Sequence, residues 1–124
     1  ISYEEAKEKA EEAILALPGW TQEMLDHIRI KLEVYHIPVK STRPVYQFVY
    51  SLASTVGHIE AIVAGKEFGS EYDKLKKEED RLFGKALPFG VSVRIDAQTG
   101  ELIGDIFIDT PPTKYTDLDF ILWE

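Results

Sequence analysis

The clearest pattern in this chain is an alternation of apolar and polar residues over 90–96. Val91, Val93 and Ile95 recur every second position, which places them on one face of a β-strand. Residues 96–100 then have the composition of a tight turn. Asp96 can accept a hydrogen bond from a backbone N–H two residues further on, and Gly100 suits a left-handed backbone that strains other residues. We therefore predict a β-hairpin over 90–109.

The return strand of this hairpin is apolar on both sides. Its expected buried face consists of Leu102, Ile106 and Ile108. Ile103 and Phe107 lie on the opposite face, together with the carboxylates Glu101, Asp105 and Asp109. We expect this strand to be covered in part on both faces.

The same periodicity predicts two strands earlier in the chain. Over 28–35, one face is expected to be buried and carries Ile28, Ile30, Leu32 and Val34. Over 45–52, one face carries Tyr46, Phe48, Tyr50 and Leu52. Aromatic residues at this spacing on a middle strand more often form the core under a helix than a recognition surface. A last alternation, at Leu118, Phe120 and Leu122, indicates either an edge strand or the start of a linker.

Helical spacing appears first over 3–17. Ser2 and Glu5 form a capping box, and Pro18-Gly19 ends the helix. Its apolar stripe consists of Tyr3, Ala6, Ala10, Ala13, Ile14 and Leu17. Thr21 is expected to cap a short turn through Asp26. A second, mostly exposed helix is predicted over 70–82, and the residues before it are the least defined, with Ile59, Ile62 and Val63 in a helical turn.

These elements predict a single α+β domain over 1–124. We expect an antiparallel sheet of about four strands with the N-terminal helix packed across one face. The second helix belongs to an insertion at about 53–88. An insertion of this kind is a common place for binding specificity.

Two segments together resemble the PepSY domain family. They are the opening Ile-Ser-Tyr-Glu-Glu-Ala-Lys-Glu-Lys-Ala and the hairpin segment Val-Arg-Ile-Asp-Ala-Gln-Thr-Gly-Glu-Leu-Ile. The resemblance covers the first helix, the hairpin and a middle strand at 45–52, but not 53–88 or the tail from 110. It implies a module of propeptides and bacterial envelope proteins, hence a secreted or envelope-attached location outside the cytoplasm.

Charge and composition narrow the classes of partner. The net charge is −8, which disfavours nucleic acid and anionic membrane surfaces. There is no cysteine, so disulfides, thiolate metal sites and cysteine catalysis are excluded. No apolar run is long enough to span a bilayer. Because the chain begins at Ile1, we expect a processed product or a piece of a longer protein, with any signal peptide or lipid anchor lying before it.

No motif for catalysis, a cofactor or a metal emerges from the residues. His27, His36 and His58 lack metal-ligand spacing. The carboxylates from Asp96 to Asp109 do not match an EF-hand loop, which requires a glycine at its sixth position. Gly65-Lys66 lacks the rest of a phosphate loop, and there is no Gly-x-Ser-x-Gly sequence. We therefore expect no enzyme activity, no cofactor and no metal.

The leading interpretation is a non-catalytic binding or regulatory module that acts on a peptidase or on an adjacent domain. Docking would use the insertion or an exposed sheet edge, either the strand at 28–35 or the C-terminal strand. Individual partner-binding residues are not assigned. The alternative is a structural spacer or homodimerising module of a surface lipoprotein, with an acid-rich enzyme a distant third. A binder is expected to expose an apolar patch rimmed by charge, and an enzyme a concave pocket with convergent titratable groups.

Overall fold

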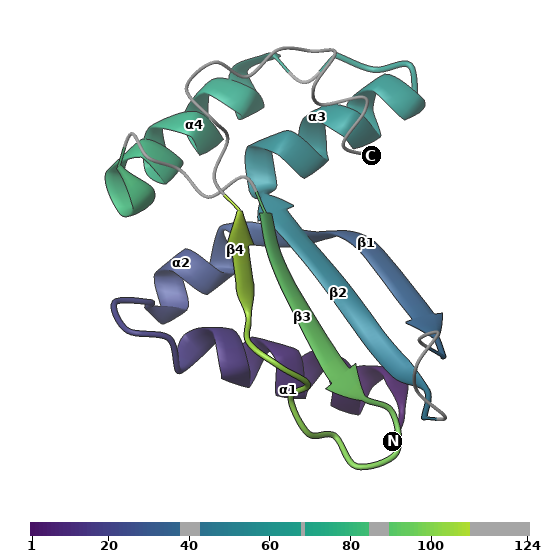
Figure 1. The fold of residues 1–124 in the computed structure, drawn as a ribbon. Coiled ribbons are helices and arrows are strands. Elements are labelled where there is room, and N and C mark those ends of the chain that lie inside the picture. The colour runs from purple at the N-terminus through teal and green to yellow at the C-terminus, as the bar shows by residue number, and fades with distance from the viewer. Residues whose placement is uncertain (38–42, 68, 85–89, 110–124) are drawn as a thin grey trace.

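The computed structural model describes residues 1–37, 43–67, 69–84 and 90–109 (Figure 1). Its elements, in chain order, are α1 (Tyr3–Leu15), α2 (Gln22–Asp26), β1 (Ile28–His36), β2 (Val45–Leu52), α3 (Ala53–Val63), α4 (Gly69–Phe83), β3 (Gly90–Asp96) and β4 (Phe107–Asp109). The predicted α+β class is confirmed. The alternation at 118–122 lies outside the described residues.

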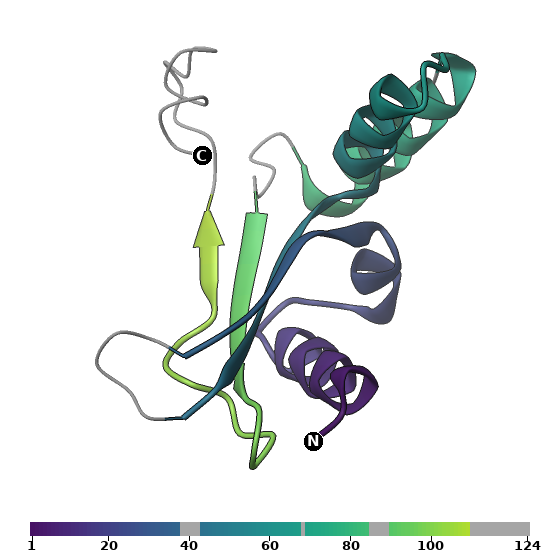
Figure 2. The ribbon, with the colours of Figure 1, turned by 90° about the vertical axis from the view of Figure 1, so that its right-hand side faces the viewer.

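The sheet has four antiparallel strands in the order β1-β2-β3-β4. Helices α1 and α2 lie against one face, as Figure 2 shows most clearly. Helices α3 and α4 lie side by side beyond the ends of the strands and project away from the sheet (Figures 1 and 2). The other face of the sheet carries none of the described helices.

Helix α1 begins as its capping residues predict. The Ser2 hydroxyl accepts a hydrogen bond from the Glu5 backbone N–H at 3.1 Å and donates one to the Glu5 carboxylate at 3.2 Å. The helix ends at Leu15, two residues before the predicted end, and Pro18 follows. Its buried side chains are Ala6, Ala10 and Ile14. Two alanines on this face let the helix backbone approach the sheet closely.

The core lies between α1 and the two central strands, as expected. Its buried members are Ala6, Ala10, Ile14, Ile28, Phe48, Tyr50, Val91, Val93 and Ile95. Phe48 lies at its centre with no exposed surface, and the Tyr3 ring meets it edge-on at 5.7 Å between centroids. The aromatic face of β2 is therefore core that receives a helix.

The prediction that β1 buries four alternating side chains is wrong for two of them. Ile28 and Ile30 contact the core, but the pairing with β2 shifts between Ile30 and Leu32. This irregularity adds one residue to β1 and turns the following side chains over. Leu32 and Val34 consequently lie on the uncovered face of the sheet, and Leu32 is 55% exposed.

The return strand of the hairpin is shorter and more exposed than predicted. Strand β4 holds only three residues, preceded by one isolated bridge between Ile95 and Leu102. Ile106 packs against the core, whereas Leu102 and Ile108 are exposed. These two side chains are exposed because β4 lies at the edge of the described sheet, whereas α1 covers the central strands (Figure 2).

Replacing Gly100 with valine is expected to destabilise the hairpin. Gly100 has φ +78°, and a Cβ there would lie 3.4 Å from the Ile1 side chain. A β-branched residue in this left-handed conformation costs about 1–2 kcal/mol. Urea unfolding measures the loss. Gly100→Asn is the matched control, because asparagine tolerates positive φ better, and equal stability of both variants and wild type would contradict the turn geometry.

Candidate binding site

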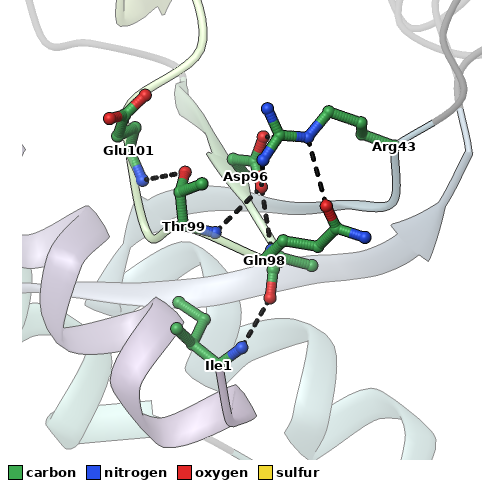
Figure 3. Close-up of polar contacts among 7 residues, drawn as sticks. Ile1, Arg43, Asp96, Gln98, Thr99 and Glu101 are labelled. Atoms are coloured by element: carbon green, nitrogen blue, oxygen red, sulfur yellow. Dashed lines mark hydrogen bonds and ion pairs between the residues drawn. The ribbon is translucent and has the colours of Figure 1, made fainter.

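The hairpin turn is held by a local polar network around Asp96 (Figure 3). The Asp96 carboxylate accepts hydrogen bonds from the backbone N–H groups of Gln98 at 2.8 Å and Thr99 at 3.0 Å. The Thr99 hydroxyl accepts one from the Glu101 N–H at 3.2 Å. Arg43, from the segment before β2, lies 3.2 Å from the same carboxylate. These contacts confirm that turn chemistry accounts for Asp96.

The turn also determines the ionisation of Asp96. Burial acts to raise the pKa of this carboxyl group. The two backbone N–H groups and the Arg43 charge act in the opposite direction and outweigh it, so the pKa lies below its ordinary value of 3.8. The remaining carboxylates of the hairpin do not join this network: Glu101 and Asp105 have exposed side chains, and the side chain of Asp109 lies outside the described part of the structure.

Because the folded chain lowers the pKa of Asp96, its carboxylate stabilises the fold at neutral pH. That contribution is lost as the pH falls below the ordinary value and through the lower pKa of the folded chain. Asp96→Asn should therefore be less stable than wild type at pH 7, with a smaller difference at pH 3. Urea midpoints at both pH values measure this. Asp105→Asn, at an exposed position, is the control and should differ little from wild type at either pH.

The three histidines lie on three separate elements. His27 follows α2, and its Nδ1 lies 2.9 Å from the Glu23 carbonyl oxygen. His36 ends β1, and its buried Nε2 has no hydrogen-bond partner among the described residues. His58 lies on α3 with its ring 5.8 Å from that of Tyr72. Nine residues of extended strand keep the first two roughly 26 Å apart. Within the described ranges, no three His, Asp or Glu side chains gather as a metal would require.

A cleft of about 610 Å³ opens between α1, β1 and the start of α3. Its lining residues are Lys7, Glu11, Leu25, Asp26, Ile28, Arg29, Ile30, Tyr50, Val56 and Glu60. Several titratable side chains converge in this cleft, which makes it a candidate active site.

Three charged groups of the cleft have close partners. Lys7 lies 3.9 Å from Glu11, and Arg29 donates hydrogen bonds to the carbonyls of Asp26 and Ile28. The Tyr50 hydroxyl donates to Glu11 at 3.5 Å. Burial and then the Glu11 charge raise the pKa of Tyr50 above its ordinary value. A tyrosine acting as base or nucleophile needs the opposite shift, so this hydroxyl is suited to donating a hydrogen bond.

The second tyrosine near α1 behaves in the same way. The hydrogen bond that the Tyr3 hydroxyl donates to Glu33, followed by its partial burial, raises the pKa of Tyr3 to about 12. Both phenols therefore remain protonated across the physiological range. Together they link α1 to the sheet, since Glu33 lies on β1 and Tyr50 on β2.

Helix α3 carries the most exposed apolar surface on the projecting pair of helices. Its buried residues, Ala53, Ser54 and Val56, all lie at its start. Further along, Ile59, Ile62 and Val63 recur at helical spacing on one face, and the last two are 64% and 83% exposed. Exposed charges surround this stripe at Glu60, Lys66 and Glu67. We call Ile59, Ile62 and Val63 the α3 stripe.

Among the described residues, the contacts that hold the helical pair to the body lie at its base. The buried carboxylate of Glu79, on α4, accepts hydrogen bonds from the Ser54 N–H at 2.9 Å and from the Ser54 hydroxyl at 2.6 Å. Trp20 meets Phe83 edge-on at 5.8 Å between ring centroids. Arg81 bonds to Glu23, which lies on α2. These contacts hold the base of the pair against the body, and none of them involves the α3 stripe.

Sequence patterns predict this surface only in part. Ile59, Ile62 and Val63 predict a helical turn, but their spacing does not say whether the apolar face is inward or outward. Nothing local to α3 indicates the buried anchor, because Glu79 lies 25 residues away from Ser54. The prediction that the strand at 28–35 is an edge is confirmed for the described sheet, where β1 lies at one end. The other predicted edge, the C-terminal strand, lies outside the described residues, and the second edge of the described sheet is β4.

In comparisons with known proteins, no family model, no curated protein and no solved structure matches this chain. The PepSY resemblance therefore stays a prediction. None of the helices in the described ranges is both long enough and apolar enough to cross a membrane. The fold and surface define a two-layer α+β module with a projecting, partly apolar helical arm.

Proposed function

We propose that this chain is a non-catalytic binding module that holds a protein partner on the α3 stripe. The observation that carries the proposal is the exposure of Ile62 and Val63 on an arm whose contacts with the body, among the described residues, lie at its base. Large exposed apolar side chains rimmed by charge are typical of interaction surfaces. A rigid helix that presents apolar residues at positions i, i+3 and i+4 is a common way to fill a hydrophobic groove.

The PepSY resemblance adds a cellular location and a class of partner to this proposal. It favours a secreted or envelope-attached bacterial protein, with a peptidase or a neighbouring domain as the partner. The engaged charges of the cleft and the raised pKa of Tyr50 support a non-catalytic role. The net charge of −8 favours a partner surface with basic residues around an apolar groove.

The test compares two variants that each add one negative charge at an exposed apolar position. Ile62→Asp changes the α3 stripe, and Leu102→Asp changes the hairpin well away from it. Each purified chain is immobilised and exposed to secreted and envelope fractions of the cells that produce it. A partner retained by wild type and Leu102→Asp, but lost with Ile62→Asp, supports the α3 stripe. Equal retention by both variants contradicts it.

The regulatory part of the proposal needs an activity measurement. If the retained partner is a peptidase, wild-type chain should lower its activity in a dose-dependent manner, whereas Ile62→Asp should not. If the activity of the peptidase is unchanged at a saturating concentration of the wild-type chain, the chain binds the peptidase without regulating it. That outcome rejects the regulatory role. Thermal unfolding of both variants checks that neither substitution acts by unfolding the chain.

One observation favours the alternative of a homodimerising spacer. Strand β1 is a nine-residue sheet edge, and a second copy can pair with an edge of this length. Sedimentation equilibrium separates the two functions. A dimer that persists in Ile62→Asp would support the spacer, while a monomer that binds its partner through α3 would support the binding module.

A further inference from the structure

The sheet face turned away from α1, which we call the open face, carries a row of three apolar side chains and one serine across the four strands. Strand pairing places Leu32 opposite Val49, Val49 opposite Ser92, and Ser92 opposite Phe107. Directly opposed residues share a face, so these four side chains form one row. The row spans roughly 14 Å at ordinary strand spacing. Its two ends, Leu32 and Phe107, are 55% and 60% exposed.

A second row on the open face adds positive charge. It consists of Val34, Gln47 and Arg94, which strand pairing again sets side by side. Arg94 is exposed, and Val34 is exposed beside the first row. The carboxylate on this face of β3, that of Asp96, is buried in the turn network with Arg43. An occupant with apolar residues and acids therefore fits this face.

The chain itself supplies a segment of that composition. Residues 114–124 read Lys-Tyr-Thr-Asp-Leu-Asp-Phe-Ile-Leu-Trp-Glu and lie outside the described structure. They combine six large apolar or aromatic side chains with three acids. The chain leaves the sheet after β4, only two residues beyond Phe107, which is one end of the apolar row. Eleven residues reach roughly 36 Å when extended, well beyond the width of the row.

We propose that residues 114–124 dock on the open face of the sheet of the same chain, with their apolar side chains over the Leu32–Phe107 row and their acids toward Arg94. Tethering through the four residues 110–113 gives the segment an effective concentration in the millimolar range, which a separate partner or a second copy must exceed. The inference does not rest on the proposed function, because the α3 stripe and the open face involve different residues.

The absence of cysteine makes the test direct. In a chain of residues 1–124, Leu122→Cys is combined with Ser92→Cys, which replaces a small residue near the centre of the row. The matched control combines Leu122→Cys with Glu8→Cys, an exposed position on α1. Under mild oxidation, the Ser92 pair should form an intrachain disulfide about tenfold faster or more than the control pair. Mass spectrometry under non-reducing conditions identifies the product.

Two outcomes would overturn the proposal. Equal rates for the two pairs would show that the segment has no preference for the open face. Disulfides formed only between chains would assign the face to a second copy. A charge reversal adds an independent readout: Arg94→Glu should slow the intrachain disulfide of the Ser92 pair, while Lys77→Glu, a reversal at an exposed position on α4, should leave its rate unchanged.

Discussion

Replacing Glu79 with alanine is expected to lower the free energy of unfolding by about 3 kcal/mol, because it leaves two buried donors without acceptors. The Glu79 carboxylate is fully buried and accepts from both the N–H and the hydroxyl of Ser54. No side chain of its own caps the start of α3, where Leu52 occupies the capping position. The Glu79 carboxylate, from helix α4, caps this end of α3 instead, and a negative charge is also favourable at a helix N-terminus.

Two companion variants separate this role from a general effect of charge or helix composition. Glu79→Gln retains an oxygen acceptor and should lose only about 1 kcal/mol, as expected for one weakened hydrogen bond. Asp80→Ala removes the neighbouring, exposed acid and should change stability by no more than about 0.5 kcal/mol. Urea unfolding measures all three. Equal losses for Glu79→Ala and Asp80→Ala would show that the buried contact does not anchor α4 to α3.

Hydrogen exchange locates the effect of Glu79→Ala within the molecule. The Ser54 amide is expected to lose protection in this variant, while amides of β3 that pair with β2 should change much less. Such a pattern would mean that the helical pair separates from the sheet before the body unfolds. That behaviour matters for the proposed function, because the α3 stripe is presented by an arm whose buried polar contact, within the described ranges, is that between Glu79 and Ser54.

The elements that sequence reasoning predicted well are those stabilised by contacts between close neighbours in the chain. The turn at Asp96 and Gly100 depends on hydrogen bonds spanning two to four residues. The start of α1 depends on Ser2 and Glu5, three residues apart. The period-two pattern of β2 gave the boundaries Val45–Leu52 directly, since a central strand covered by a helix shows its buried face clearly.

The features that sequence reasoning missed depend on distant partners. One extra residue in β1 turns Leu32 and Val34 to the open face. The alternation of apolar and polar residues does not reveal this shift, because it depends on the pairing with β2. The full length of α3 could not be predicted, because its start is capped by Glu79, which lies 25 residues from Ser54 in the chain. The exposure of the α3 stripe could not be predicted for the same reason, since exposure of an apolar residue is a property of the packed molecule.

Replacing Phe48 with alanine is expected to cost about 3–5 kcal/mol, the largest loss from a single apolar position. Phe48 is the largest of the fully buried side chains and lies on the face of β2 that receives α1. The cavity would open beneath α1, where the buried Ala6 and Ala10 are too small to fill it. A thirteen-residue helix is marginal in water without packing, so the loss should extend to α1 itself.

The measurement combines urea unfolding with near-ultraviolet circular dichroism, which reports the packing of Tyr3, Tyr46 and Tyr50 around the missing ring. Phe48→Leu keeps most of the volume and should lose about 1 kcal/mol with a retained aromatic signal. Leu102→Ala removes exposed apolar surface and should lie within about 0.5 kcal/mol of wild type. If Phe48→Ala costs no more than Leu102→Ala, helix α1 cannot owe its position to the aromatic face of β2, and the two-layer packing would have to be abandoned.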